Sequence, residues 1–173
     1  KTGDTLYAAR LQATRSLWDP TYMEDSWITR DNLKEPMQEL RRLQASIKKH
    51  YPGTKLAVGE YDFGGKNHIS GTIAQADALG IFGREGLFAA TFWPQAGIGA
   101  YGNDGAKAYA YVFGAFRLYR DYDGNGSSFG DVGLGASSSD PDRASIYASQ
   151  RADGKRVLVA INRTSRALLA SIP

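Results

Sequence analysis

Strand-like and helix-like segments alternate along the first two thirds of this sequence, and that alternation restricts its possible folds more than any other feature. Apolar runs typical of buried strands lie at residues 12–20, 54–60 and 87–93. Segments of helical periodicity follow each of them, at residues 31–51, from residue 70 onward and at residues 106–119. Strands and helices that alternate through short loops form parallel βα units. Three units are too few for a closed (β/α)8 barrel, but they fit the last third of one, about its strands 6–8. The sequence therefore predicts an α/β fold that forms the C-terminal portion of such a barrel.

The helix expected at residues 31–51 has the clearest pattern. Its apolar face, spaced by three and four residues, consists of Met37, Leu40, Leu43 and Ile47. Pro36 falls within the expected first turn, where proline is tolerated, and Pro52 follows the expected end at Tyr51. Residues 80–86, which begin and end with glycine, instead predict a turn without a chemical role.

The pattern changes after Tyr122. Residues 123–128 are rich in glycine and serine and predict a linker, and helical periodicity does not return beyond it. Short strands are expected at residues 144–150, 156–162 and 166–171, with a hairpin turn at 152–154. We therefore expect two parts, with residues 1–122 as the C-terminal part of a (β/α)8 barrel and residues 123–173 as part of an all-β sandwich.

Net charge and residue types exclude several classes of function. The formal charge is +3, and basic residues are interleaved with acidic ones, so neither a nucleic acid nor a membrane surface is expected as a partner. No apolar run approaches the roughly 20 residues that cross a bilayer. The absence of cysteine excludes disulfides, zinc thiolates and cysteine nucleophiles, and two histidines leave little room for a histidine-based metal site. Aromatic residues reach 12%, which suits either sugar stacking or core packing.

Glu60 is the strongest candidate for chemistry. It ends the strand expected at 54–60, and the carboxyl ends of barrel strands carry the active site. Trp93 ends the next expected strand and Trp18 the previous one, so an acid and two aromatic residues are expected at the same end. The structural alternatives stay open here: Glu60 caps a helix or pairs with an arginine, and each tryptophan packs beneath a loop. His68 likewise either contacts substrate or is a structural histidine.

Three longer segments carry a more specific resemblance. Residues 15–28 (RSLWDPTYMEDSWI), 55–64 (KLAVGEYDFG) and 67–86 (NHISGTIAQADALGIFGREG) resemble, in this order, segments of glycoside hydrolase family 44. The resemblance is firm over residues 11–93 and looser beyond. The family consists of endo-acting β-1,4-glucanases, many active on xyloglucan and some on xylan or mannan. Its members combine a barrel with a β-sandwich and retain the anomeric configuration.

The resemblance implies that Glu60 is the nucleophile, on the seventh barrel strand. The acid/base of the family is a second glutamate on the fourth strand, which is expected outside these 173 residues, in the N-terminal part of the same polypeptide. A retaining glycosidase needs two carboxyl groups about 5 to 5.5 Å apart, so Glu60 alone cannot complete the reaction. Family members usually carry Asn and Trp where Asp62 and Phe63 stand here, which bears on substrate preference and not on the nucleophile.

Aromatic and polar side chains near Glu60 are the expected substrate contacts. The candidates are Trp93, Trp27, Tyr61, Trp18, Tyr22 and His68. Arg15 and Tyr22 are also expected to keep Glu60 ionised. The other acids of the first segment, which are not expected to be its catalytic partner, are Asp19, Glu24 and Asp25.

No cofactor is expected for the reaction. Residues 121–126 begin like a calcium loop, but an EF-hand needs glutamate where Val132 stands, so a solvated linker is favoured. The resemblance permits a structural calcium whose ligands are not mapped, and a polymeric β-glucan substrate implies secretion. The alternative function is that of a non-catalytic polysaccharide-binding or structural fragment. Because part of a barrel exposes a strand edge, the chain is expected to be stable and active only with the preceding part of its polypeptide.

Overall fold

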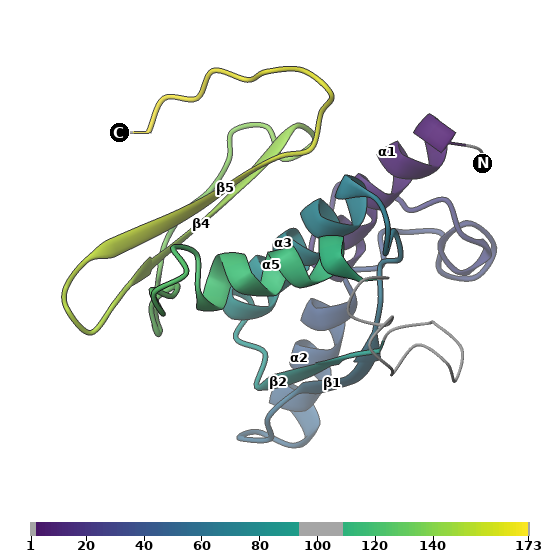
Figure 1. The fold of residues 1–173 in the computed structure, drawn as a ribbon. Helices are drawn as coiled ribbons and strands as arrows, with labels where there is room; N and C mark the ends of the chain where they lie inside the picture. Colours follow the sequence, from purple (N-terminus) through teal and green to yellow (C-terminus); the bar gives the residue numbers. More distant parts are fainter. Residues whose placement is uncertain (1–2, 94–108, 173) are drawn as a thin grey trace.

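The computed structural model describes residues 3–93 and 109–172 (Figure 1). The α-helices are α1 (Gly3–Ala13), α2 (Glu39–His50), α3 (Ile69–Arg84) and α5 (Ala110–Arg120). Between α1 and α2 lie a short 3-10 helix and a π-helix, η1 (Thr14–Leu17) and η2 (Ile28–Leu33). The strands are β1 (Ala57–Tyr61), β2 (Ala89–Phe92), β3 (Val132–Leu134), β4 (Ala144–Gln150) and β5 (Arg156–Asn162). None of the described helices is both long and apolar enough to span a membrane.

β1 and β2 form a parallel pair, and α3 connects them. The predicted order of strand, helix and strand over residues 54–93 is therefore confirmed. The next helix, α5, packs beside α3, and the Tyr119 hydroxyl donates to the Ala76 carbonyl across this contact at 2.9 Å. This confirms the helix predicted at 106–119 over its described part, since residues 106–108 lie outside the described residues.

The strand predicted at residues 12–20 is wrong. α1 runs to Ala13 and η1 continues to Leu17, so the segment is largely helical. The preceding YAARLQA is rich in alanine, leucine and arginine, which are good helix formers. Alternation over so few positions does not separate a strand from a helix. The described residues therefore contain two parallel strands, where the sequence predicted three.

The helix predicted at residues 31–51 is divided. η2 closes at Lys34, which has a left-handed φ of 56°, and α2 begins only at Glu39. Pro36 thus lies between two helices, which corrects its expected place in a first turn. Its ring disfavours helical backbone in the preceding residue, and this explains the interruption. The predicted end is confirmed at His50, and Leu40 of the apolar face is fully buried.

β3, β4 and β5 form an antiparallel sheet in that order. β4 and β5 confirm two predicted strands and the turn between them, where Gly154 has a φ of 82°. The strand predicted at 166–171 is wrong, because that stretch has no regular structure, and the three-residue β3 is too short for a period to show. The predicted boundary after Tyr122 falls in the loop between α5 and β3, and the division into two parts stays a prediction.

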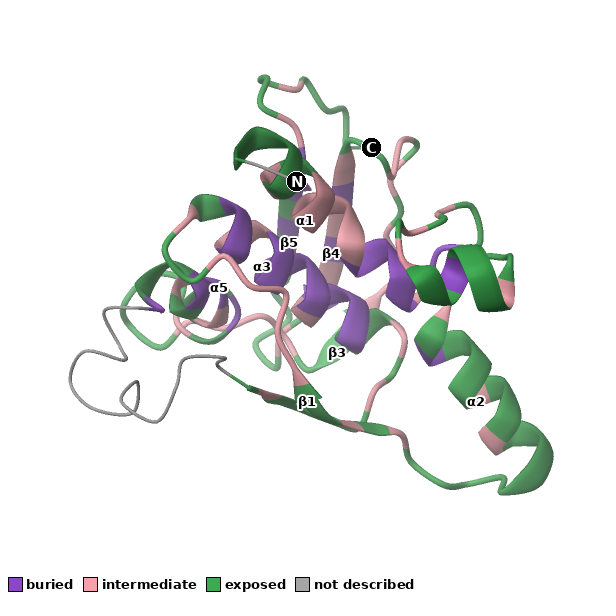
Figure 2. Cartoon of the chain, turned by 90° about the vertical axis from the view of Figure 1, so that its right-hand side faces the viewer, coloured by how far each residue is buried: buried purple, intermediate pink, exposed green. Residues whose placement is uncertain are grey.

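One hydrophobic core joins this sheet to the helices. Its members on α3, β4 and β5 are Ala76, Ala78, Ile81, Phe82, Tyr147, Val159 and Ile161. Figure 2 shows the buried residues concentrated along α3 and on the facing strands. Gly80 permits this contact, because a Cβ there would lie 2.3 Å from the Tyr147 ring. The turn predicted at 80–86 is wrong, since α3 continues to Arg84 and Gly80 serves close packing.

Candidate active site

Glu60 lies at an irregularity in the pairing of β1 with β2. Val58 pairs with Ala90 and Tyr61 with Phe92, so Gly59 and Glu60 together lie opposite Thr91 alone. β1 therefore holds one extra residue, which is a β-bulge. Bulges redirect side chains, and here the Glu60 side chain is exposed while Val58 and Tyr61 both pack against the core.

Tyr61 faces the core, away from the exposed side of the strand. Its ring makes edge contacts with Phe82 at 4.9 Å and Phe92 at 5.8 Å between centroids. Its hydroxyl accepts a hydrogen bond of 2.6 Å from the Gln75 side-chain amide on α3. Burial raises the pKa of Tyr61, so the phenol stays neutral. These contacts occupy the ring that the sequence assigned to substrate stacking and favour a structural role for it.

The loop that follows Glu60 is held by side chains from two helices. Arg10 of α1 donates to the Phe63 carbonyl at 2.9 Å and to the Ser70 hydroxyl at 2.7 Å. His68 caps α3, because its Nδ1 accepts from the Ser70 backbone N–H at 3.1 Å. The Tyr7 ring stacks on the His68 ring with centroids 3.6 Å apart. Of the two roles left open for His68, these contacts support the structural one.

Gly71 allows this loop to lie against the first turn of α3. A Cβ on Gly71 would lie 2.3 Å from the Gly65 carbonyl oxygen, and Gly65 itself has a φ of +74°. We expect Gly71→Ala to lower the free energy of unfolding by about 1–3 kcal/mol, since backbone cannot move aside as a side chain can. Thermal unfolding of the purified protein measures this.

Gly83→Ala is the matched control, because Gly83 lies in the same helix and a Cβ there meets nothing within 4 Å. This substitution should raise stability by about 0.5–1 kcal/mol, since alanine favours helix more than glycine does. Equal effects at the two positions would contradict the close approach of the loop to α3.

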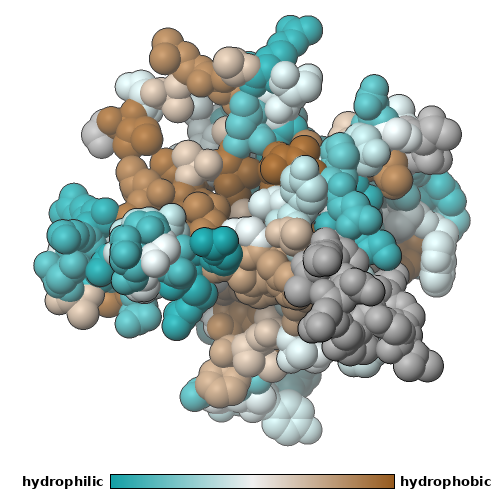
Figure 3. Space-filling view, in the orientation of Figure 1, coloured by the Kyte–Doolittle hydropathy of each residue, from teal (hydrophilic) through white to brown (hydrophobic). Residues whose placement is uncertain are grey.

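Trp93 and Trp27 are the exposed aromatic candidates. Trp93 follows β2 directly, is 48% exposed, and donates its backbone N–H to the Tyr61 carbonyl at 2.9 Å. Because Phe92 faces the core, the alternation of a strand directs Trp93 to the side of the pair that exposes Glu60. Trp27 is 62% exposed and precedes η2. In Figure 3, apolar surface shows over the lower part of the molecule, where Figure 1 draws β1 and β2.

Trp18 and Tyr22 are engaged by arginines. The Arg84 guanidinium lies 4.1 Å from the Trp18 ring centroid and that of Arg41 lies 5.4 Å away. The Arg15 guanidinium lies 4.9 Å from the Tyr22 ring. Burial, followed by the charge of Glu24, raises the pKa of Tyr22. Trp18 and Tyr22 are half-buried, whereas Trp27 and Trp93 are exposed.

Arg15 bonds with acids other than Glu60. It is buried, and its guanidinium pairs with Asp19 at 2.8 Å and with Asp142. The expectation that Arg15 keeps Glu60 ionised is therefore wrong. Burial raises the pKa of Asp19, but hydrogen bonds from Thr21 and Arg15 outweigh it and bring the pKa below its usual value. These contacts favour a structural role for Asp19.

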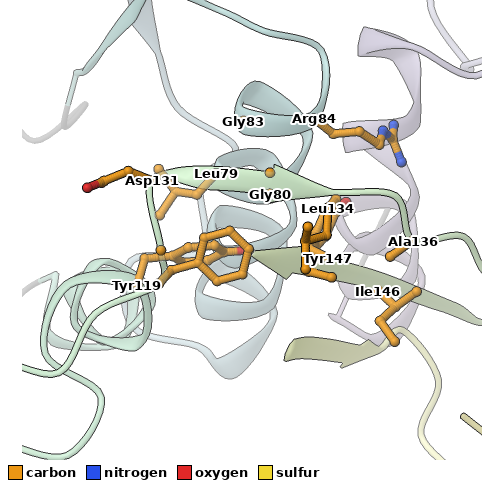
Figure 4. A pocket seen from close by; sticks show the side chains of 14 residues that line it. Leu79, Gly80, Gly83, Arg84, Tyr119, Asp131, Leu134, Ala136, Ile146 and Tyr147 are labelled. Carbon is orange, nitrogen blue, oxygen red and sulfur yellow. The ribbon is translucent and has the colours of Figure 1, made fainter. Parts of the chain in front are cut away.

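Two hollows among the described residues both lie away from Glu60. One, of about 170 Å³, lies between α3 and the antiparallel sheet, where Figure 4 shows Tyr119 and Tyr147 near Gly80. The other, of about 440 Å³, lies near the amino ends of β1 and β2 and is lined by Lys55 and Phe88. Glu60 lines neither hollow, and its side chain is exposed on β1.

The acids of residues 121–126 bond within their own loop. Asp121 accepts from the Gly126 backbone N–H at 2.6 Å, and Asp123 accepts from that of Asn125 at 2.9 Å. Hydrogen bonds lower the pKa of Asp123, and the largest contribution comes from the Ser127 side chain, followed by the Asn125 backbone. Across the two described ranges, no group of three or more histidine or acidic side chains is placed to hold a metal ion. The hydrogen bonds of Asp121 and Asp123 within their own loop favour the interpretation of this segment as a linker.

Known proteins match the chain over most of its length. No model of a known protein family matches the sequence. Over 142 residues, which are 82% of the chain, it is 50% identical to endoglucanase A of Paenibacillus lautus. The chain spans 19% of that relative.

Solved structures match the fold at similar identity. A family 44 xyloglucanase from Paenibacillus polymyxa aligns with 93% of the chain at a TM-score of 0.82 and 42% identity. That enzyme has also been solved with xyloglucan. A family 44 endoglucanase from Clostridium acetobutylium ATCC 824 aligns with 92% of the chain at a TM-score of 0.81 and 44% identity. The chain spans 30% of each of these structures.

Proposed function

The chain is related by sequence and fold to a portion of the enzymes of glycoside hydrolase family 44. On that premise we propose that it supplies the nucleophile of a retaining endo-β-1,4-glucanase. The observation that carries the proposal is the placement of Glu60. Its carboxylate is exposed near the carboxyl end of a parallel strand, and the bulge in β1 keeps it off the core side. Barrel enzymes build their active sites at this end of their strands.

The reaction needs a second carboxyl group from the preceding part of the polypeptide. Glu60 attacks the anomeric carbon while a protonated acid delivers its proton to the leaving glycosidic oxygen. The same acid, now ionised, then takes a proton from the water that hydrolyses the ester on Glu60. In this proposal β1 and β2 are two of eight barrel strands, and the preceding part of the polypeptide supplies others.

Xyloglucan and related β-1,4-glucans are the proposed substrates, and secretion is the proposed localisation. The support for the substrate is the P. polymyxa relative, which is a xyloglucanase. The support for secretion is the size of such polymers, which meet an enzyme outside the cell. The reaction itself requires no cofactor, because both of its steps use carboxyl groups and water.

A mechanism-based label tests the nucleophile. The complete polypeptide is incubated with an activated 2-deoxy-2-fluoro cellobioside, which forms a slowly hydrolysed ester on a retaining nucleophile. Intact mass should rise by one fluorosugar, and peptide mapping should locate it on Glu60. A label on another residue would overturn the assignment. Binding of xyloglucan without any label or hydrolysis would instead support the non-catalytic function that the exposed Trp27 and Trp93 permit.

Trp93 is the proposed stacking residue beside Glu60. We expect Trp93→Ala to raise KM for xyloglucan about threefold to tenfold, since an aromatic contact contributes about 0.5–1.5 kcal/mol. The kcat should change little if the contact is equally strong in the transition state. Tyr51→Ala is the control, because this exposed aromatic precedes the opposite end of β1. An unchanged KM in Trp93→Ala would show that Trp93 does not contact the substrate.

A further inference from the structure

The bulge in β1 shifts the alternation of the strand by one residue. Leu56 and Val58 pack against the core at a spacing of two, and Tyr61 and Phe63 resume this pattern three residues later. Without the extra residue, Glu60 would continue the series of Leu56 and Val58 and point toward α3. The direction of the Glu60 carboxylate therefore depends on a change of phase between Val58 and Tyr61.

Steric demands of Gly59 do not explain this change of phase. A Cβ on Gly59 meets nothing within 4 Å, and its φ lies outside the left-handed region. The constraint must come from the residues that fix the strand on either side of the bulge. Val58 lies before it and Tyr61 directly after Glu60, and Tyr61 makes the more specific contacts.

Tyr61 is fixed at both the ring and the hydroxyl. Phe82 and Phe92 contact the ring edge-on, which sets the side of the strand on which it lies. The hydroxyl bond to Gln75 at 2.6 Å then sets how far the ring reaches toward α3. Because Tyr61 is covalently next to Glu60, fixing its side chain fixes the rotation of the strand at the carboxylate.

Gln75 is an unusual residue for the place it occupies. It is 1% exposed in the middle of α3, and its Oε1 has no hydrogen-bond partner among the described residues. A buried amide that leaves one atom unpaired costs stability compared with an apolar residue of its size. The bond to Tyr61 is the contact that the described part of the chain provides for this amide.

We propose that Tyr61 and Gln75 are positioning residues that hold the bulge in phase and so aim the carboxylate of Glu60. The inference rests on the proposed function of Glu60 as nucleophile. Neither residue touches the substrate in this arrangement. Loss of their bond lets the end of β1 shift, and a shift of about 1 Å at a reacting group costs on the order of 100-fold in rate.

The test compares Tyr61→Phe, Gln75→Leu and the double variant in the complete polypeptide, with kcat and KM on xyloglucan and the rate of fluorosugar labelling. Tyr61→Phe keeps the ring contacts and removes the hydroxyl alone. We expect kcat and the labelling rate to fall about 10- to 100-fold in each single variant. KM should stay within about twofold, and the double variant should be no slower than the singles, because one bond is lost in all three.

Tyr119→Phe is the matched control, since it removes another buried hydroxyl that bonds to α3, at the Ala76 carbonyl. It should lower the melting temperature and leave kcat unchanged. Equal loss of kcat in Tyr119→Phe and Tyr61→Phe would overturn the proposal, because general destabilisation would then explain both. A normal kcat in Tyr61→Phe and Gln75→Leu would also overturn it. If Glu60→Gln is itself active, the proposed function fails instead, so the two failures are distinguishable.

Discussion

Glu60→Gln is expected to lower kcat of the complete polypeptide on β-1,4-glucans by roughly 10⁴-fold or more, as removal of a covalent nucleophile does elsewhere. Glutamine has nearly the same shape, but its amide cannot attack the anomeric carbon. Because the Glu60 side chain is exposed, the melting temperature should stay close to that of the unmodified protein. Initial rates on xyloglucan and carboxymethylcellulose, measured beside a thermal unfolding curve, separate lost chemistry from lost folding.

Chemical rescue gives this prediction a second readout. In Glu60→Gly the space of the side chain is open to a small anion, and added azide should restore turnover with an activated aryl cellobioside and give a glycosyl azide of inverted configuration. Glu35→Gln, which changes an exposed acid outside the strands, should keep full activity. A kcat for Glu60→Gln within about tenfold of the original would refute the nucleophile assignment.

Asp77→Asn is expected to have the largest effect on folding, a loss of about 3–5 kcal/mol, which is the cost of leaving a buried charge without its partner. The side chains of Asp77 and Arg163 are each 1% exposed and form an ion pair of 2.6 Å. The carboxylate also accepts from Ser145 at 2.5 Å, from Tyr147 at 2.7 Å, and from Thr14. An amide replaces one acceptor atom with a donor, so it leaves both the arginine and part of this set unsatisfied.

Urea unfolding of the purified protein measures this loss, and Asp142→Asn is the control. Asp142 also pairs with a buried arginine, Arg15, but its side chain is 70% exposed and Arg15 keeps its bond to Asp19. The control should cost about 1 kcal/mol or less. Arg163→Met should destabilise as strongly as Asp77→Asn, and the double variant should cost less than the sum of the two. Simple additivity would show that the two residues act independently.

Part of the fold could be predicted because local patterns and local structure agree. Glycine and proline bound the apolar runs that became β1 and β2, and Gly154 marks the hairpin between β4 and β5. The failures lie where a short pattern permits two structures. Residues 12–20 alternate like a strand, yet the helix formers before them continue into η1. Residues 166–171 are apolar enough for a strand but form none.

The candidate site shows the same division. The position of Glu60 near the end of β1 could be predicted, because it depends on the end of one strand, while its role as nucleophile stays a prediction. The side on which Tyr61 lies could not be read from simple alternation, since the bulge depends on pairing with β2. A signal was nevertheless present in the change from a spacing of two at Leu56 and Val58 to three before Tyr61. Asp77 and Arg163 left no comparable signal, because 86 positions separate them.

α3 supports two neighbours through residues only two positions apart. Gln75 reaches toward β1, while Asp77 reaches toward β4 and Arg163. A chimera that exchanges residues 123–172 with those of a relative would therefore exchange three of the four side chains that bond to Asp77, which are Ser145, Tyr147 and Arg163. It would also change the contacts that position α3, the helix whose Gln75 bonds to Tyr61. The antiparallel sheet therefore cannot be exchanged independently of α3. The sheet and α3 have to be exchanged together, and a variant that replaces the sheet alone should lose stability through Asp77 and, through the displaced α3, catalytic rate.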